Sequence, residues 1–201
     1  MNSSLPRSKP GITCLIAFML LAGLIILTSC SSKSGEISQL QQEVWTRPQN
    51  AESFMRLGNA LARDQRYNEA TEAFKNALAI NPKLDMAYRA LGAIAFNQNN
   101  YNSALFYFQK YLERAPKDPV RLYDVGNAYM KLKQYDKAIK AYSDAVDKSE
   151  SFAEAHYNLA ICYINTGRRA EAEAIYEWLL VKNNYLAFSL QRHLNKEKKG
   201  L

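Results

Sequence analysis

The sequence has 201 residues, 48% of them apolar and 22% charged, with a formal net charge of +7. This composition is ordinary for a globular protein. The three cysteines, Cys14, Cys30 and Cys162, are too few to imply a disulfide framework. The modest positive charge comes without an aromatic–basic RNA motif or zinc-finger spacing, so it favours a solvated surface over nucleic-acid binding.

The N-terminal segment has the pattern of a secretory signal. Residues 1–10 carry Arg7 and Lys9 and no acid, and residues 11–27 are almost wholly apolar. The stretch ends in Leu-Thr-Ser-Cys, which resembles the lipobox of bacterial lipoproteins. The resemblance implies cleavage before Cys30 and acylation of that cysteine. We therefore predict a lipoprotein signal peptide at 1–29, followed by the lipidated Cys30 and a flexible tether at 30–35.

A retained membrane anchor is the alternative for the same segment. The apolar run 12–27 is shorter than the roughly 20 residues that a membrane span needs. Because the basic residues precede the apolar run, both interpretations place the rest of the chain outside the cytoplasm. In the lipoprotein family an Asp after the cysteine favours the inner membrane, and Ser31 stands there in this chain. We therefore expect an outer-membrane protein facing the periplasm, with a single-pass inner-membrane anchor as the alternative.

Residues 36–48 are predicted to form a lone helix. Ile37, Leu40, Val44 and Trp45 fall on one helical face. The interval from Pro48 to Pro82 is the same as the repeat period that recurs later in the chain. This segment therefore reads as an N-terminal half-repeat that covers the open face of the first full repeat.

Residues 51–186 contain four copies of one pattern, with a period of about 34 residues. The copies are 51–84, 85–118, 119–152 and 153–186. The first copy presents the pattern at Phe54, Leu57, Gly58, Leu61, Ala70, Phe74, Ala77 and Pro82. Apolar residues recur within each copy at steps of three and four, which predicts two amphipathic helices per copy. A single helix pair cannot bury both of its faces, so the copies must stack.

Small residues at fixed positions are predicted to let the two helices of a copy approach closely. They are Gly58, Gly92 and Gly126 in the first helix and Ala70, Ala104, Ala138 and Ala172 in the second. Between the helices stand good N-cap types, namely Asn68, Asn102 and Asp136. Pro82 and Pro116 are expected to close the second helix.

The pattern resembles the tetratricopeptide repeat (TPR) family, whose signature is W-x2-L-G-x2-Y, then A-x3-F, then P. The resemblance implies an all-α, right-handed superhelical α-solenoid of TPR helix hairpins, preceded here by the N-terminal signal or anchor segment. The fourth copy departs from the signature, with His156 for the aromatic residue, Ala160 for the glycine and no proline.

Residues 187–201 are predicted to form a C-terminal capping helix. Leu190 and Leu194 provide a narrow apolar stripe, and the remaining positions are mostly polar or basic. A last helix with one wet face lets a stack end without exposing its core. A basic tail that binds acidic lipid is the alternative.

Catalysis is not expected, and neither a cofactor nor a metal is predicted. His156 occupies a packing position, and His193 has no cysteine or acid at metal-binding spacing. Cys162 has no basic partner in the sequence. The sequence contains no HExxH motif, Gly-rich phosphate loop or G-x-S-x-G motif.

In the TPR family the concave face of the first helices binds partners. Transferred to this chain, the resemblance implies a groove that includes Arg56, Asn59, Arg63, Arg89, Phe96, Tyr123, Asn127, Lys131, Tyr157 and Asn158. Asn side chains can pair with a peptide backbone, and the aromatic rings offer apolar contact. The clamp of chaperone-binding relatives is not matched at Met55, Ala90, Val120 or Asp124.

These features predict a non-catalytic, membrane-anchored scaffold or adaptor of the bacterial cell envelope, which binds a peptide or protein segment in its concave groove. Two narrower functions remain as alternatives. The first is a pilus or secretion-system assembly lipoprotein, and the second is an adaptor or regulator of cell-wall-remodelling enzymes.

Overall fold

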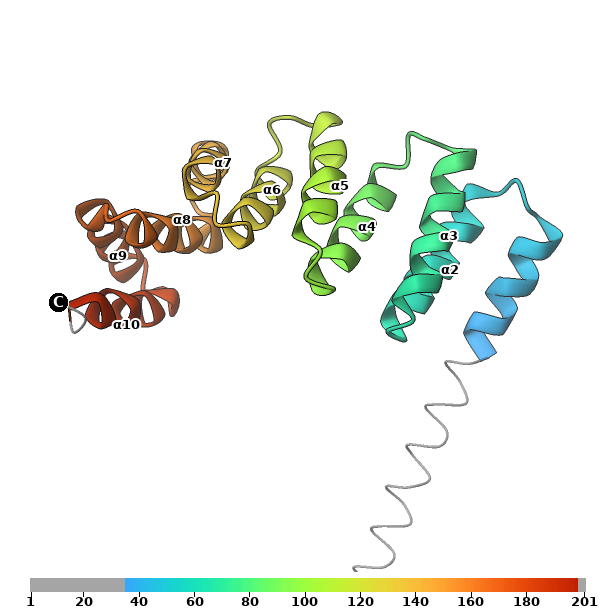
Figure 1. The fold of residues 1–201 in the computed structure, drawn as a ribbon, viewed down its shortest axis with the longest axis horizontal. Coiled ribbons are helices and arrows are strands. Elements are labelled where there is room, and N and C mark those ends of the chain that lie inside the picture. Colours follow the sequence, from blue (N-terminus) through green and yellow to red (C-terminus); the bar gives the residue numbers. More distant parts are fainter. Residues whose placement is uncertain (1–34, 199–201) are drawn as a thin grey trace, which may run out of the picture.

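The computed structural model describes residues 35–198, and all regular elements in this range are helices. An N-terminal helix spans residues 35–46. It is followed by α2 (Ala51–Arg63), α3 (Tyr67–Ile80), α4 (Asp85–Asn97), α5 (Tyr101–Glu113), α6 (Pro119–Lys131), α7 (Tyr135–Lys148), α8 (Ala153–Asn165), α9 (Arg169–Val181) and α10 (Leu186–Lys198). The helices stack in chain order along one axis, which confirms the predicted all-α solenoid (Figure 1).

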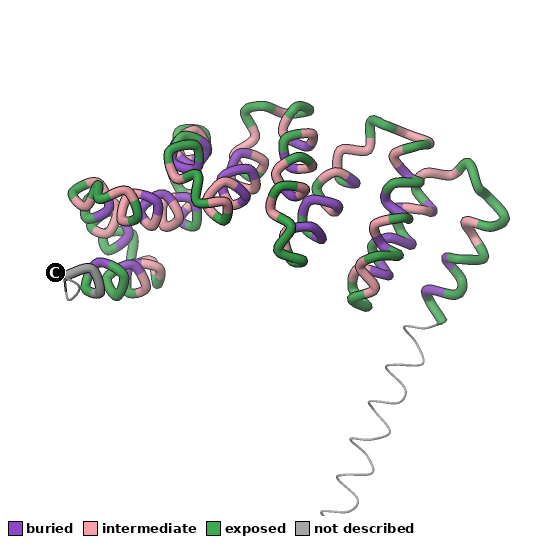
Figure 2. The backbone as a smooth tube through the Cα atoms, viewed as in Figure 1, coloured by how far each residue is buried: buried purple, intermediate pink, exposed green. Residues whose placement is uncertain are grey.

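Each repeat contributes a first and a second helix, such as α2 and α3. Buried residues recur on the side that each helix turns towards its neighbours, and exposed residues lie on the outside (Figure 2). None of the described helices is long and apolar enough to cross a membrane. The predicted signal peptide and Cys30 lie outside the described residues.

The glycines make the close helix contacts that the sequence predicts. A Cβ atom on Gly58 would lie 2.7 Å from the Phe74 ring, and one on Gly92 would lie 2.5 Å from the Phe108 ring. Gly126 faces Tyr142 in the same way, at 2.6 Å. Carbon atoms do not approach so closely without a shift of their surroundings, so the aromatic ring of the second helix occupies the space of the missing methyl group.

The prediction for the turns inside the repeats was wrong. Asn68, Asn102 and Asp136 lie inside the first turns of α3, α5 and α7, and the N-cap residues are Arg66, Asn100 and Gln134. Instead, a residue with positive φ lies two positions after the end of the first helix of each repeat: Gln65 (62°), Asn99 (60°), Lys133 (58°) and Gly167 (74°). After α2, the Arg66 N–H donates to Leu61 O at 2.9 Å and the Gln65 N–H donates to Ala62 O at 3.1 Å. This Schellman arrangement turns the chain within three residues, so the second helix starts earlier than its asparagine or aspartate.

Two first helices do have side-chain caps. Asn50 Oδ1 accepts from the N–H groups of Glu52 (3.0 Å) and Ser53 (3.3 Å) at the start of α2. Asp118 does the same at the start of α6, where Pro119 stands at the first helical position. The second helices α3 and α5 end at Ile80 and Glu113, just before the prolines that the sequence assigned to their ends.

The N-terminal helix packs against α2, but its predicted apolar face was partly wrong. Ile37 and Leu40 are buried in the core of the first repeat, and Val44 packs against that core. Trp45 is 82% exposed. Because Trp45 follows Val44 directly, it points about 100° away from the stripe that Ile37, Leu40 and Val44 form at steps of three and four.

At the other end, α10 packs on α8 and α9. Ala187, Leu190 and Leu194 are buried in the same core as Leu179 of α9. The Arg169 guanidinium of α9 donates to Leu194 O at 3.1 Å. The stripe of Leu190 and Leu194 therefore covers the end of the stack, as the sequence predicted.

Candidate protein-binding groove

Within the described chain, an open hollow of about 320 Å³ lies on the first helices α2, α4 and α6. Its lining is Met55, Asn59, Met86, Arg89, Ala90, Ala93, Phe108 and Asp124. The second repeat has Ala90 and Ala93 at positions where the third has Asp124 and Asn127. These short side chains leave the space, and the methionines supply an adaptable apolar wall.

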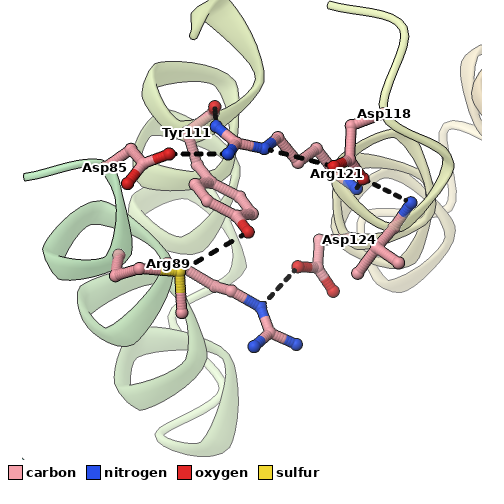
Figure 3. A network of polar contacts seen from close by, with 8 residues as sticks. Asp85, Arg89, Tyr111, Asp118, Arg121 and Asp124 are labelled. Carbon is pink, nitrogen blue, oxygen red and sulfur yellow. Dashed lines mark hydrogen bonds and ion pairs between the residues drawn. The ribbon is translucent and has the colours of Figure 1, made fainter. Parts of the chain in front are cut away.

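An ion pair lies across one side of this hollow (Figure 3). Arg89 Nε donates to Asp124 Oδ2 at 3.3 Å, and the side chains are 44% and 14% exposed respectively. Burial raises the pKa of Asp124, and the positive charge of Arg89 opposes this shift. Arg89 thus joins the second and third repeats while much of its side chain stays accessible.

A second network, which the sequence analysis missed, lies beside the first (Figure 3). Arg121 of α6 donates from Nη2 to Asp85 Oδ2 at 2.6 Å and from Nη1 to Tyr111 O at 2.7 Å. Its guanidinium lies 3.9 Å from the centroid of the Tyr111 ring. The sequence contains one signal for this network: Arg121 is a large basic residue at a repeat position where the other repeats have the small residues Ser53, Ala87 and Ala155. Arg121 therefore forms a charged joint between the second and third repeats.

Further along the concave face, predicted groove residues bond to one another. Asn127 Oδ1 accepts from the Tyr142 hydroxyl at 2.7 Å and from Asn158 Nδ2 at 2.9 Å. Asn158 Nδ2 also lies 3.2 Å from the Tyr123 hydroxyl oxygen, to which it donates. Burial raises the pKa of both tyrosine hydroxyls above the ordinary value, so both remain neutral. The side-chain polar groups named here are therefore already paired with one another within the protein.

Two predicted groove arginines are held by the N-terminal helix. Arg56 pairs with Glu43, and Arg63 Nη2 lies 2.6 Å from Glu36 Oε1. The Ser53 hydroxyl donates to the same Glu43 carboxylate at 2.7 Å, and this bond, together with Arg56, lowers the pKa of Glu43. Both arginines thus link the N-terminal helix to the first repeat.

The remaining predicted residues are spread along the solenoid. Phe96 packs edge-on against Tyr101 at 5.3 Å between centroids, and Tyr157 meets the His193 ring of α10 at 6.4 Å. Asn59 and Lys131 are exposed. Of the ten predicted residues, the hollow brings together Asn59 and Arg89, and the hydrogen-bonded cluster brings together Tyr123, Asn127 and Asn158.

His156 and Cys162, the side chains that could be reactive, are packed against other residues of the fold. His156 stacks on Trp178 with 3.9 Å between ring centroids, and its Nε2 lies 3.0 Å from Glu150 O. Burial lowers the pKa of His156 and raises the pKa of Cys162 to about 12. Among residues 35–198, no three His, Cys, Asp or Glu side chains are placed to hold a metal ion.

Two family models match the chain. The model described as tetratricopeptide repeat matches residues 61–125, and the model described as anaphase-promoting complex, cyclosome, subunit 3 matches residues 97–179. Human tetratricopeptide repeat protein 21B is 32% identical over 105 residues, which are 52% of this chain and 8% of that protein. The chain thus matches a small part of a much longer relative.

Solved structures share the fold. MamA from Desulfovibrio magneticus superposes with a TM-score of 0.69 at 23% identity, over 82% of this chain and 89% of that chain. YrrB, described as a TPR protein with an unusual peptide-binding site, superposes with a TM-score of 0.67 at 19% identity, over 88% of each chain. At these identities the likeness shows the fold alone. The regular sequence period, the stacked helix pairs and the matching family models agree. The chain therefore belongs to the tetratricopeptide repeat proteins.

Proposed function

We propose that this protein is a non-catalytic scaffold of the bacterial cell envelope, which is anchored to a membrane and binds an extended segment of a partner protein in its concave groove. The TPR fold supports a protein-interaction scaffold that binds peptides. The observation that carries the proposal is the hollow over α2, α4 and α6.

The lining of the hollow suits a short stretch of a partner chain. Met55, Met86, Ala90 and Ala93 can bury an apolar side chain of about the size of leucine or methionine. Arg89 uses Nε for Asp124, and its two Nη nitrogens take no part in that contact. These nitrogens can donate to a backbone carbonyl or a carboxylate of the partner beside the apolar anchor.

Site-specific photocrosslinking in cells tests the groove. A photoreactive residue in place of Ala93, which is exposed in the hollow, should capture the partner. A photoreactive residue in place of Phe106, which is 54% exposed on α5, is the matched control. Adding Met86→Glu and Arg89→Glu should abolish the adduct at position 93. Equal capture at positions 93 and 106, or capture that survives both substitutions, would sink the proposal.

The anchoring part of the proposal depends on Cys30 and is tested separately. Metabolic labelling with radiolabelled palmitate should label the wild-type protein and the Cys14→Ala variant, because Cys14 lies within the predicted signal peptide. The Cys30→Ala variant should remain unlabelled. Equal labelling of all three proteins would contradict acylation at Cys30 and leave the groove proposal standing.

A further inference from the structure

Four large apolar side chains are exposed close together in sequence at the end of α9 and the start of α10. They are Leu180 (44%), Val181 (79%), Tyr185 (73%) and Phe188 (70%). Elsewhere among the described residues, the large exposed apolar side chains occur singly: Trp45, Met86, Phe106 and Val120. Since Leu190 and Leu194 already cover the end of the stack, these four side chains are not needed for capping. We call them, with Lys182 and Arg192, the C-terminal patch.

The charge around the patch has one sign along the chain. No Asp or Glu stands between Glu177 and Glu197, whereas Lys182, Arg192 and Lys196 fall in that stretch. The Arg192 guanidinium lies 5.7 Å from the centroid of the Phe188 ring, so charge and apolar surface adjoin directly. One acid approaches from another element, since Glu150 and Lys182 line the same hollow of about 250 Å³.

We propose that the C-terminal patch docks on an anionic lipid bilayer. Exposed aromatic and aliphatic side chains gain by entering the boundary between headgroups and acyl chains, and basic side chains beside them gain from anionic headgroups. Tyr185 suits this boundary because its ring is apolar and its hydroxyl is polar. A second copy of the chain fits less well, because a two-fold contact through this patch would bring the basic side chains of one copy close to those of the other.

This contact is independent of the groove and of any attachment through residues 1–34. The patch lies at the end of the solenoid opposite the N-terminal helix (Figure 1). If Cys30 is also acylated, the two attachments would hold the stack along the bilayer instead of letting it extend away from it.

Hydrogen exchange measured by mass spectrometry tests the docking locally. The full chain is bound to vesicles of phosphatidylcholine, or of phosphatidylcholine with phosphatidylglycerol. We expect amides in residues 179–194 to exchange more slowly on the anionic vesicles, and amides in α4 to exchange equally on both. Because the readout is confined to α9 and α10, attachment elsewhere in the chain does not affect it. High salt should remove the difference.

A pair of matched variants completes the test. Phe188→Ser with Arg192→Glu should lose the protection, and α8 should keep its exchange rates because both side chains are exposed. The matched control is Phe106→Ser with Lys110→Glu, which changes two residues at the same spacing on α5, where Glu113 lies 3.0 Å from Lys110 Nζ. This control variant should keep the protection of residues 179–194 on anionic vesicles. Equal exchange on the two vesicle types, or protection that persists in the Phe188 and Arg192 variant, overturns the proposal.

Discussion

Asn59 and Asn127 occupy the same position in the first and third repeats, yet the two halves of the concave surface use them differently. Asn59 is exposed on the rim of an open hollow. Asn127 is partly buried and accepts hydrogen bonds from Tyr142 and Asn158. The position in the repeat decides which way a side chain points, but the neighbouring repeats decide whether its polar atoms remain available to a partner.

The contrast arises from the residues that surround each asparagine. The second repeat places Ala90 and Ala93 beside Asn59, so nothing fills the surface in front of it. The third and fourth repeats place Tyr142 and Asn158 beside Asn127, and both donate to its amide oxygen, while Asn158 also donates to the Tyr123 hydroxyl. The N-terminal half therefore leaves side chains accessible in an open hollow, and in the C-terminal half the equivalent side chains bond to one another.

The sharpest way to test this contrast is to remove both asparagines in turn. Asn127→Ala should lower the free energy of unfolding by about 3 kcal/mol, because the buried Tyr142 hydroxyl and the Asn158 amide lose their common acceptor. Asn59→Ala should change it by less than about 0.5 kcal/mol, as surface substitutions do. Urea unfolding followed by circular dichroism measures both, and equal losses would break the comparison.

The glycines extend the comparison to the interior of the repeats. Gly92→Ala should cost about 2 kcal/mol, because its Cβ would overlap the Phe108 ring and the gain in helix propensity offsets only part of that strain. The fourth repeat already has Ala160 at this position, and its partner Tyr176 is half-buried, whereas Phe108 is buried.

The matched control is therefore Ala160→Gly. It should also destabilise the protein, by about 2 kcal/mol, because glycine lowers helix propensity by about 1 kcal/mol and the lost methyl group is fully buried. Thermal unfolding of the two variants is the measurement. A Gly92→Ala variant as stable as the wild-type protein would show that the ring contact contributes nothing.

The third and fourth repeats also differ at the positive-φ residue of the turn between their two helices. Lys133 has a φ of 58°, and Gly167 holds the equivalent position of the fourth repeat at 74°. Lys133→Gly should stabilise the protein by about 1 kcal/mol because the Cβ is strained in this region, and Gly167→Lys should destabilise it by a similar amount. Thermal unfolding measures both effects. If the melting temperatures of the Lys133→Gly and Gly167→Lys variants shift in the same direction, the prediction is wrong.

The smallest predicted effect is a dependence on pH in the C-terminal half. Burial lowers the pKa of His156 below 6.5, so the unfolded chain binds more protons just below that value. Stability from the neutral ring is present above pH 6.5 and is lost as the pH falls towards the folded pKa. His156→Phe, which restores the aromatic type of Phe54, should flatten this part of the stability curve. Parallel curves for both proteins would refute the assignment.

Much of the fold could be predicted because the repeat presents each rule several times. The close approach at Gly58, Gly92 and Gly126 and the buried face of the last helix follow from residue size and spacing. The turns were harder, since Gln65 and Lys133 are not typical left-handed residues and nothing in their local sequence signals a positive φ. The exposure of Trp45 depends on where the N-terminal helix meets α2.

The sequence alone determined the repeat period, the helix pairs and the small residues between them. The helical period and the longer period of the repeat are enough for that, because both act through neighbours along the chain. Only the tertiary structure decided which side chains are still available. The acceptors for Tyr142 and Asn158 come from other helices, and the partners of Arg56 and Arg63 lie in the N-terminal helix. Whether a polar side chain finds a hydrogen-bond partner depends on its distance to side chains of neighbouring repeats. The residue pattern within one repeat does not give these distances.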